Sequence, residues 1–163
     1  MKNKLSIGFT GTVSCGKTTL VKALAELPQF KDFYIATERS KYLRDLGIPL
    51  NTDSNLNGQM IFAAERASEL LHEDLITDRT IIDVQAFTSL AKSISNKQKN
   101  DFIELTSHLI NQYDWIFYVH PGGVPIEDNG VRTIDEKYRN EIDLKIRSLI
   151  KRNDENIKNF GII

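Results

Sequence analysis

The chain has 163 residues, a formal net charge of −1 at pH 7 and 40% hydrophobic residues, which suits one folded domain with its own core. The near balance of acidic and basic residues argues against a broad surface for nucleic acids or membranes. The single cysteine, Cys15, excludes an intramolecular disulfide and a zinc cluster. No apolar stretch approaches membrane-spanning length, so we expect a single domain over residues 1–163 in a reducing cytoplasm.

The N-terminal part of the chain predicts a strand, a turn and a helix. Leu5, Ile7 and Phe9 alternate with small residues, which is typical of a buried strand beneath a closely packed helix. Residues 11–18 then read Gly-Thr-Val-Ser-Cys-Gly-Lys-Thr and fit the pattern G-x-x-x-x-G-K-[ST]. Apolar residues at helical spacing follow over residues 17–27 and stop at a proline. This order of elements is the context that identifies a phosphate-binding loop.

The residue types of this loop suit the binding of a nucleotide. Gly11 and Gly16 permit backbone geometry that a side chain would block, so that N–H groups can form an anion cradle at a helix N-terminus. Lys17 is expected to reach the β- and γ-phosphates of ATP, and the Thr18 hydroxyl is expected to ligate Mg²⁺. The residues expected to bind the nucleotide are Gly11, Ser14, Cys15, Gly16, Lys17, Thr18 and Thr19.

The rest of the sequence alternates between strand and helix patterns. We expect further helices over residues 38–46, 59–72, 82–95, 99–112 and 135–152. We expect further strands over residues 33–36, 74–78, 114–120 and 157–163. The unbroken apolar run at residues 115–119 is typical of a strand covered on both faces. The alternation predicts an α/β fold with a mainly parallel sheet.

Ligands of such sheets bind beyond the carboxyl ends of the strands. We therefore expect the phosphate loop, Glu38, the Asp78-Arg79 pair and the loop that begins at Pro121 to surround one crevice. A carboxylate at Asp78 could hold the Mg²⁺ shell opposite Thr18, although aspartate also favours helix N-caps. Glu38 could accept or position the proton of an acceptor hydroxyl, or it could simply be an acidic residue in the first turn of a helix.

Other charged residues are candidates for substrate or transition-state contacts. Arg79 and Arg39 could bind the substrate, and Asp83 is a candidate contact that would equally suit the dipole of the helix it begins. Arg132 and Arg139 are seven residues apart and can share one face of a helix. Arginine suits the charge that develops on a transferring phosphoryl group. Surface ion pairs and a charged helix face are the alternative interpretation of these arginines.

Together these motifs resemble those of NadR-like P-loop kinases, of which the nicotinamide riboside kinase domain is the best-known member. Thymidylate and deoxynucleoside kinases are similar at a greater distance. The motifs that carry the resemblance are residues 11–18, Thr37-Glu38-Arg39, Thr77-Asp78-Arg79, Glu127-Asp128-Asn129-Gly130-Val131-Arg132 and Tyr138-Arg139. The resemblance implies a three-layer P-loop NTPase fold with a five-stranded sheet and a lid at about residues 121–139. It also implies that Arg132 and Arg139 are lid arginines and that Asp78 faces Mg²⁺.

The expected activity is a phosphotransferase that moves the γ-phosphoryl of ATP·Mg²⁺ to a small nucleoside or nucleotide. The residues expected to take part in catalysis are Lys17, Glu38, Asp78, Arg132 and Arg139, and those expected to bind the acceptor are Glu38, Arg39, Arg79 and Asp83. Three alternatives stay open. They are a kinase acting on a hydroxymethylated base in DNA, a P-loop ATPase or nucleotide switch acting on a protein partner, and a binder of ATP that has lost transfer. The sequence carries no Asn-Lys-x-Asp guanine-recognition run, which argues against the switch.

Overall fold

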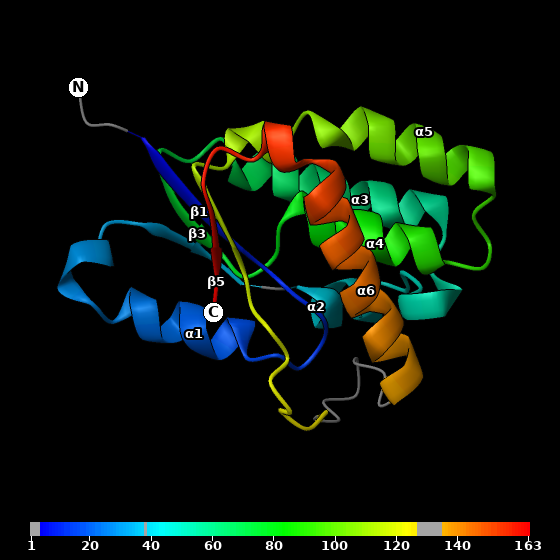
Figure 1. The fold of residues 1–163 in the computed structure, drawn as a ribbon, viewed down its shortest axis with the longest axis horizontal. Coiled ribbons are helices and arrows are strands. Elements are labelled where there is room, and N and C mark those ends of the chain that lie inside the picture. The colour runs from blue at the N-terminus through cyan, green and yellow to red at the C-terminus, as the bar shows by residue number, and fades with distance from the viewer. Residues whose placement is uncertain (1–3, 38, 127–134) are drawn as a thin grey trace.

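The computed structural model describes residues 4–37, 39–126 and 135–163 (Figure 1). The strands of its described part are β1 (Leu5–Thr10), β2 (Tyr34–Ala36), β3 (Asp74–Thr77), β4 (Trp115–Tyr118) and β5 (Phe160–Ile162). The α-helices of the same part are α1 (Lys17–Ala25), α2 (Ser40–Asp45), α3 (Leu56–Glu69), α4 (Ile81–Leu90), α5 (Asn96–Ser107) and α6 (Glu136–Arg152). Short 3₁₀ turns lie at residues 28–30, 51–53, 110–112 and 154–156.

The strands form one five-stranded sheet in the order β2-β3-β1-β4-β5, and every pairing is parallel. The central strand β1 pairs with β3 on one side and β4 on the other, in a register that sets Gly8 beside Thr77 and Ile116. Gly8 is required for close packing, because a Cβ there would lie 2.5 Å from the Thr80 side chain. The structure thus confirms the expected α/β fold with a parallel sheet.

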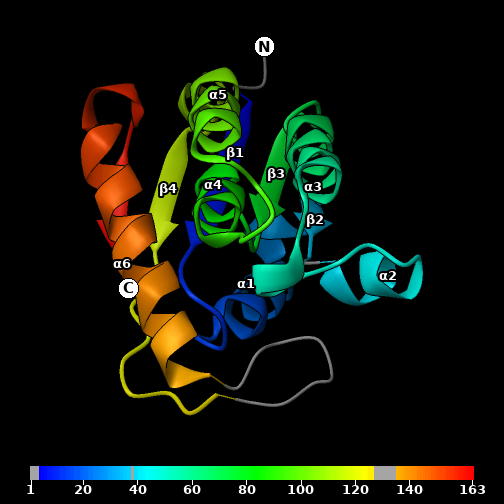
Figure 2. The same cartoon turned by 90° about the vertical axis from the view of Figure 1, so that its right-hand side faces the viewer.

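Helices cover the two faces of the sheet unequally. Figure 1 shows α3, α4, α5 and α6 on one side of the sheet and α1 on the other, and Figure 2 looks onto the larger layer. Helix α4 is central in the larger layer, because it contacts α3, α5 and α6. The result is the expected three-layer arrangement. No helix within the described ranges is both long and apolar enough to cross a membrane.

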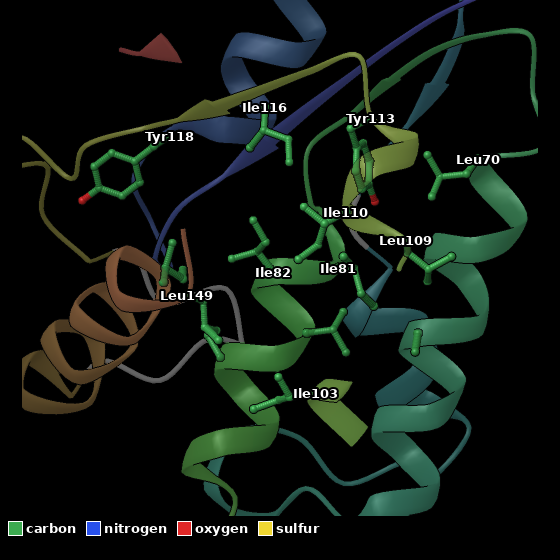
Figure 3. Packing of buried hydrophobic residues seen from close by; sticks show 14 of the residues in the cluster. Leu70, Ile81, Ile82, Ile103, Leu109, Ile110, Tyr113, Ile116, Tyr118 and Leu149 are labelled. Carbon is green, nitrogen blue, oxygen red and sulfur yellow. The ribbon is translucent and has the colours of Figure 1, made fainter. Parts of the chain in front are cut away.

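The larger core lies between the sheet and the α4 layer. Ile81 and Ile82 of α4 are fully buried there, and Figure 3 shows Ile116 of β4 and Leu149 of α6 in the same cluster. A smaller cluster on the α1 face includes Phe9, Val21 and Val119. The neighbours of β1 in the sheet contribute to both clusters, since Leu75 of β3 and Ile116 of β4 lie in the larger one and Ile76 and Phe117 pack in the smaller one. The loop that follows β1 therefore starts from a well-packed sheet.

Several helix ends differ from the expected ranges because side-chain caps set them. The helix expected from residue 59 already begins at Leu56, since the Asn55 side chain accepts a hydrogen bond from the Gly58 N–H (2.9 Å). The helix expected over residues 82–95 ends at Leu90. Ser95 instead caps α5 in a reciprocal capping box with Gln98.

Candidate active site

The loop between β1 and α1 adopts a conformation that glycine permits. Gly16 has a φ of +91° and no atom within 4 Å of a Cβ placed on it, so its backbone angle, not lack of space, favours glycine. Gly11 shows the opposite case, because its Cβ would lie 2.7 Å from the Val119 carbonyl oxygen. Ser14 also has a positive φ, of 55°. Left-handed residues of this kind turn successive N–H groups inward and form a concave anion site.

Lys17 begins α1 and is buried, with 6% of its surface exposed. Its Nζ donates hydrogen bonds to the carbonyl oxygens of Gly11 (2.6 Å) and Thr12 (2.8 Å). Both acceptors are neutral, so these bonds position the ammonium without neutralising its charge. The loop therefore holds a cation at the N-terminus of a helix, where two sources of positive potential add.

Thr18 and Asp78, predicted separately from two motifs, lie in direct contact. The Thr18 Oγ1 donates a hydrogen bond to Asp78 Oδ2 at 2.7 Å. The backbone N–H of Asp78 donates to the carbonyl oxygen of Ala36 (3.1 Å), which ties the carboxylate to the end of β2. Asp78 Oδ1 is buried and accepts no hydrogen bond from any described residue. A hydroxyl beside an unpartnered carboxylate oxygen is a donor set that fits Mg²⁺.

Arg139 joins helix α6 to the phosphate loop. Its Nη2 donates to the Ser14 carbonyl oxygen at 3.3 Å, and its own carbonyl oxygen accepts from Thr12 Oγ1 at 2.7 Å. The residue is 6% exposed, and among the described residues it forms an ion pair with Glu136 at 4.0 Å. Arg139, in the first turn of α6, thus donates one hydrogen bond to the loop and accepts another from it.

A cavity of about 120 Å³ lies over the loop. Its lining is residues 13–19, Asp78, Arg79 and Val124. Most of the expected nucleotide-binding residues therefore surround one space, together with the pair that follows β3. The Arg79 guanidinium carbon lies 5.0 Å from the centre of the Phe87 ring, so α4 supports this arginine from below.

Asp83 does not line this cavity and is fully buried. Its Oδ2 accepts hydrogen bonds from the Thr80 N–H (2.8 Å) and hydroxyl (3.1 Å) in a capping box at the start of α4. Its Oδ1 accepts from the Gly11 N–H at 3.2 Å. Both carboxylate oxygens are engaged within the protein, so Asp83 links α4 to the phosphate loop. Sequence reasoning missed this role, for which the Thr-x-x-Asp capping pattern was the available signal.

Arg39 lies apart from the phosphate loop. It pairs with Glu65 at 3.4 Å and stacks over Tyr42 at 4.6 Å, with 53% of its side chain exposed. It lines a different cavity, of about 690 Å³, between β2 and α3. Glu38, Arg132 and the rest of the run 127–134 lie outside the described residues, so the roles expected for them stay predictions.

A buried charge pair lies next to the Asp78 segment, and sequence reasoning missed it. Arg66 is 1% exposed and forms an ion pair with Glu69 one helical turn later in α3. The other Glu69 oxygen lies 3.0 Å from the Thr77 hydroxyl, which in turn lies 2.9 Å from the Arg79 carbonyl oxygen. Burial raises the pKa of the Glu69 carboxyl above its ordinary value. The pair thus supports the backbone that presents Asp78.

A glycine-rich loop after the central parallel strand, with a buried lysine and a threonine–aspartate pair, defines a P-loop nucleotide-binding domain. A family model described as an AAA domain matches residues 6–158, and the chain belongs to this family. None of the curated proteins matches the sequence.

Solved structures of low sequence identity share the fold. A deoxyadenosine kinase from M. mycoides, with dCMP and a flexible dCDP bound, matches with a TM-score of 0.67 and 17% identity over 96% of this chain and 89% of that chain. NadR in complex with NAD and AMP-PNP matches with a TM-score of 0.71 and 14% identity over 98% of this chain and 44% of that chain. A thymidylate kinase from Ehrlichia chaffeensis matches at 0.60 and 18%, over 98% and 89%. The expected resemblance to NadR-like kinases is confirmed at the level of the fold.

Proposed function

We propose that this protein is a kinase that transfers the γ-phosphoryl of ATP·Mg²⁺ to a small nucleoside or nucleotide. The observation that carries the proposal is the convergence of Lys17, Asp78 and Arg139 on one phosphate loop. Phosphoryl transfer requires little covalent chemistry from the protein, so positioning and charge stabilisation supply most of the catalysis. The shared fold with deoxyadenosine and thymidylate kinases supports the same class of reaction.

Each group has a role in this proposal. The loop N–H groups and Lys17 bind the β- and γ-phosphates, Arg139 faces the charge of the transferring phosphoryl group, and Arg79 binds the acceptor. Thr18 and Asp78 would hold Mg²⁺, which neutralises phosphate oxygens when bound. Glu38 would position the acceptor hydroxyl. Arg132 is proposed to act with Arg139 in the lid, and Arg39 is proposed to contact the acceptor. Asp83 is not among the proposed acceptor contacts, because its two carboxylate oxygens accept hydrogen bonds from Gly11 and Thr80.

The acceptor is proposed to lie between Glu38, Arg79 and helix α3. A free nucleoside or nucleoside monophosphate is the first choice, because the formal net charge of −1 indicates no extended surface for DNA. The proposed closure of the lid over the site would exclude water and favour transfer to the acceptor over hydrolysis.

The test is ADP release from ATP·Mg²⁺ with a panel of acceptors. The panel holds nicotinamide riboside, the deoxynucleosides, their monophosphates and DNA that contains hydroxymethyluracil, with Lys17→Ala as the inactive control. Lys22→Ala, a lysine on the last turn of the same helix, is the matched control and should leave turnover unchanged. A Lys17-dependent signal with one small acceptor supports the proposal. A signal confined to DNA, or tight ATP binding with no transfer to any acceptor, contradicts it.

A further inference from the structure

The Tyr138 hydroxyl is a buried polar group without a hydrogen-bond partner among the described residues. The residue lies in the first turn of α6 and is 4% exposed. Buried hydroxyls are almost always hydrogen-bonded, because burial without a partner lowers stability. Phenylalanine would fill the same space without that penalty. A phenol that has no partner among the described residues of a packed helix interface is therefore a candidate for binding a ligand oxygen.

The surroundings of Tyr138 connect it to the cavity over the phosphate loop. Its ring packs at 6.4 Å from the Phe87 ring of α4, and Phe87 in turn supports Arg79 at 5.0 Å. Arg79 lines the cavity, and its charge acts electrostatically on the Tyr138 hydroxyl. The next residue, Arg139, reaches the loop itself at Ser14. One turn of α6 thus places Arg139 on the phosphate loop and Tyr138 against Phe87, the ring that also supports Arg79.

The hydroxyl is available as a donor at any physiological pH. Burial raises the pKa of Tyr138 well above its ordinary value. The phenol therefore keeps its proton and is a hydrogen-bond donor within the electrostatic reach of the Arg79 cation. A pair of donors of this kind suits an oxygen-bearing group, either a sugar hydroxyl or a phosphate.

We infer that the Tyr138 hydroxyl donates a hydrogen bond to an oxygen of the phosphoryl acceptor, beside Arg79. This inference rests on the proposed kinase function. Residues 13–19 of the loop are expected to hold the donor nucleotide, whereas Tyr138 packs on the α4 side with the arginine proposed to bind the acceptor. Tyr138 is then a substrate-binding residue that selects acceptors with an oxygen at this position.

The test compares Tyr138→Phe with the unaltered protein in acceptor kinetics and thermal unfolding. The KM for the acceptor should rise about tenfold, as expected for the loss of one buried hydrogen bond, with an unchanged KM for ATP. The Tm of the free protein should stay the same or rise, because the substitution removes an unpartnered polar group. Parallel series with the nucleoside and its monophosphate locate the oxygen on the sugar or on the phosphate.

Tyr118→Phe is the matched control, because the Tyr118 hydroxyl already donates to Asp143 at 2.7 Å. This variant should lower the Tm and leave the acceptor KM unchanged. A Tyr138→Phe protein with an unchanged acceptor KM, an equal rise in the KM for ATP, or a lowered Tm overturns the inference while the proposed function stands. If the unaltered protein phosphorylates no acceptor of either series, the proposed function fails and the role of Tyr138 fails with it.

Discussion

At the scale of single residues, the feature most directly tied to the proposed chemistry is Asp78 Oδ1, which has no hydrogen-bond partner among the described residues. Asp78→Asn keeps the size of the side chain and removes its charge. We expect kcat to fall by about 100-fold or more, because loss of one preorganised electrostatic contact costs about that much. The Mg²⁺ concentration needed for half-maximal activity should rise as well, and a magnesium titration of initial rates measures both effects.

Asp101→Asn is the control for this substitution. The substitution is chemically the same, but Asp101 lies on the exposed face of α5, where it pairs with Lys97 at 2.6 Å. Its kinetics and magnesium dependence should match those of the unaltered protein. Full activity of Asp78→Asn at low magnesium would show that Asp78 is only the residue that anchors the loop to β2.

Glu69 makes a residue-scale prediction about stability and pH. Because burial raises the pKa of its carboxyl in the folded state, the folded protein binds this proton more tightly than the unfolded chain. The stabilisation from the protonated carboxyl is complete below the ordinary pKa of 4.5 and is lost as pH rises through the folded-state pKa. The free energy of unfolding should therefore fall with pH more steeply in the unaltered protein than in Glu69→Gln. Urea unfolding between about pH 4 and pH 8 measures the difference.

Glu104→Gln, an exposed position on α5, is the control and should leave the pH profile unchanged. Parallel profiles for Glu69→Gln and the unaltered protein would contradict the raised pKa of Glu69. The activity of Glu69→Gln can be measured as well. Glu69 contacts the Thr77 hydroxyl, and Thr77 immediately precedes Asp78.

Residue type alone predicted some of these contacts and not others. Lys17 and Thr18 could be placed because their motif requires them, and Asp78 because it ends a strand beside that motif. Arg66 could not be placed, since arginine is rarely buried and its sequence neighbours give no sign of a core position. Asp83 was recognised as a residue near a helix start, but its bond to Gly11 depends on tertiary packing between α4 and the loop.

At the scale of elements, the first turn of helix α6 should contribute to catalysis, because it carries Arg139. Arg139→Ala removes a buried cation from the phosphate loop and should lower kcat by about 10²–10³-fold while raising the KM values less. The expected cause is lost charge stabilisation in the transition state, because the transferring phosphoryl group carries spread negative charge. Initial-rate kinetics over ATP and acceptor concentrations separate the two parameters.

Arg147→Ala supplies the comparison for α6. Arg147 lies two turns further along the helix, is 53% exposed and pairs with Asp143 at 3.3 Å. Its loss should leave both kcat and KM near their original values. An Arg139→Ala enzyme with an unchanged kcat would refute a role for α6 in the transfer step.

The elements themselves were predictable to different degrees. Periodicity located the strands and the long helix α6, because their apolar faces are continuous. Periodicity wrongly extended the helix of α4 to residue 95. The turn at residues 91–95 still contains apolar side chains, and Ala91 and Ile94 are buried. The capping bonds of Ser95 set the boundary there, and hydrophobic spacing carries no information about such bonds.

At the scale of the whole molecule, nucleotide binding should be coupled to folding. The loop is held between β1, α4 through Asp83 and α6 through Arg139, so a ligand in the cavity contacts groups that three elements position. A ligand that binds only the folded state at a concentration of 100 times its Kd adds about 2.7 kcal/mol to the free energy of unfolding. For a domain of this size that corresponds to a rise in Tm of roughly 5–10 °C.

Thermal unfolding with and without saturating ATP·Mg²⁺ measures this coupling. The same experiment on Lys17→Ala should show little or no rise, because the variant lacks the cation held inside the loop. Asp83→Asn should lower the Tm of the free protein, since it weakens the link between α4 and the loop, yet should retain part of the ATP-induced rise because Lys17 and Thr18 remain. A rise of equal size in Lys17→Ala would place the nucleotide away from the loop and contradict the proposed site.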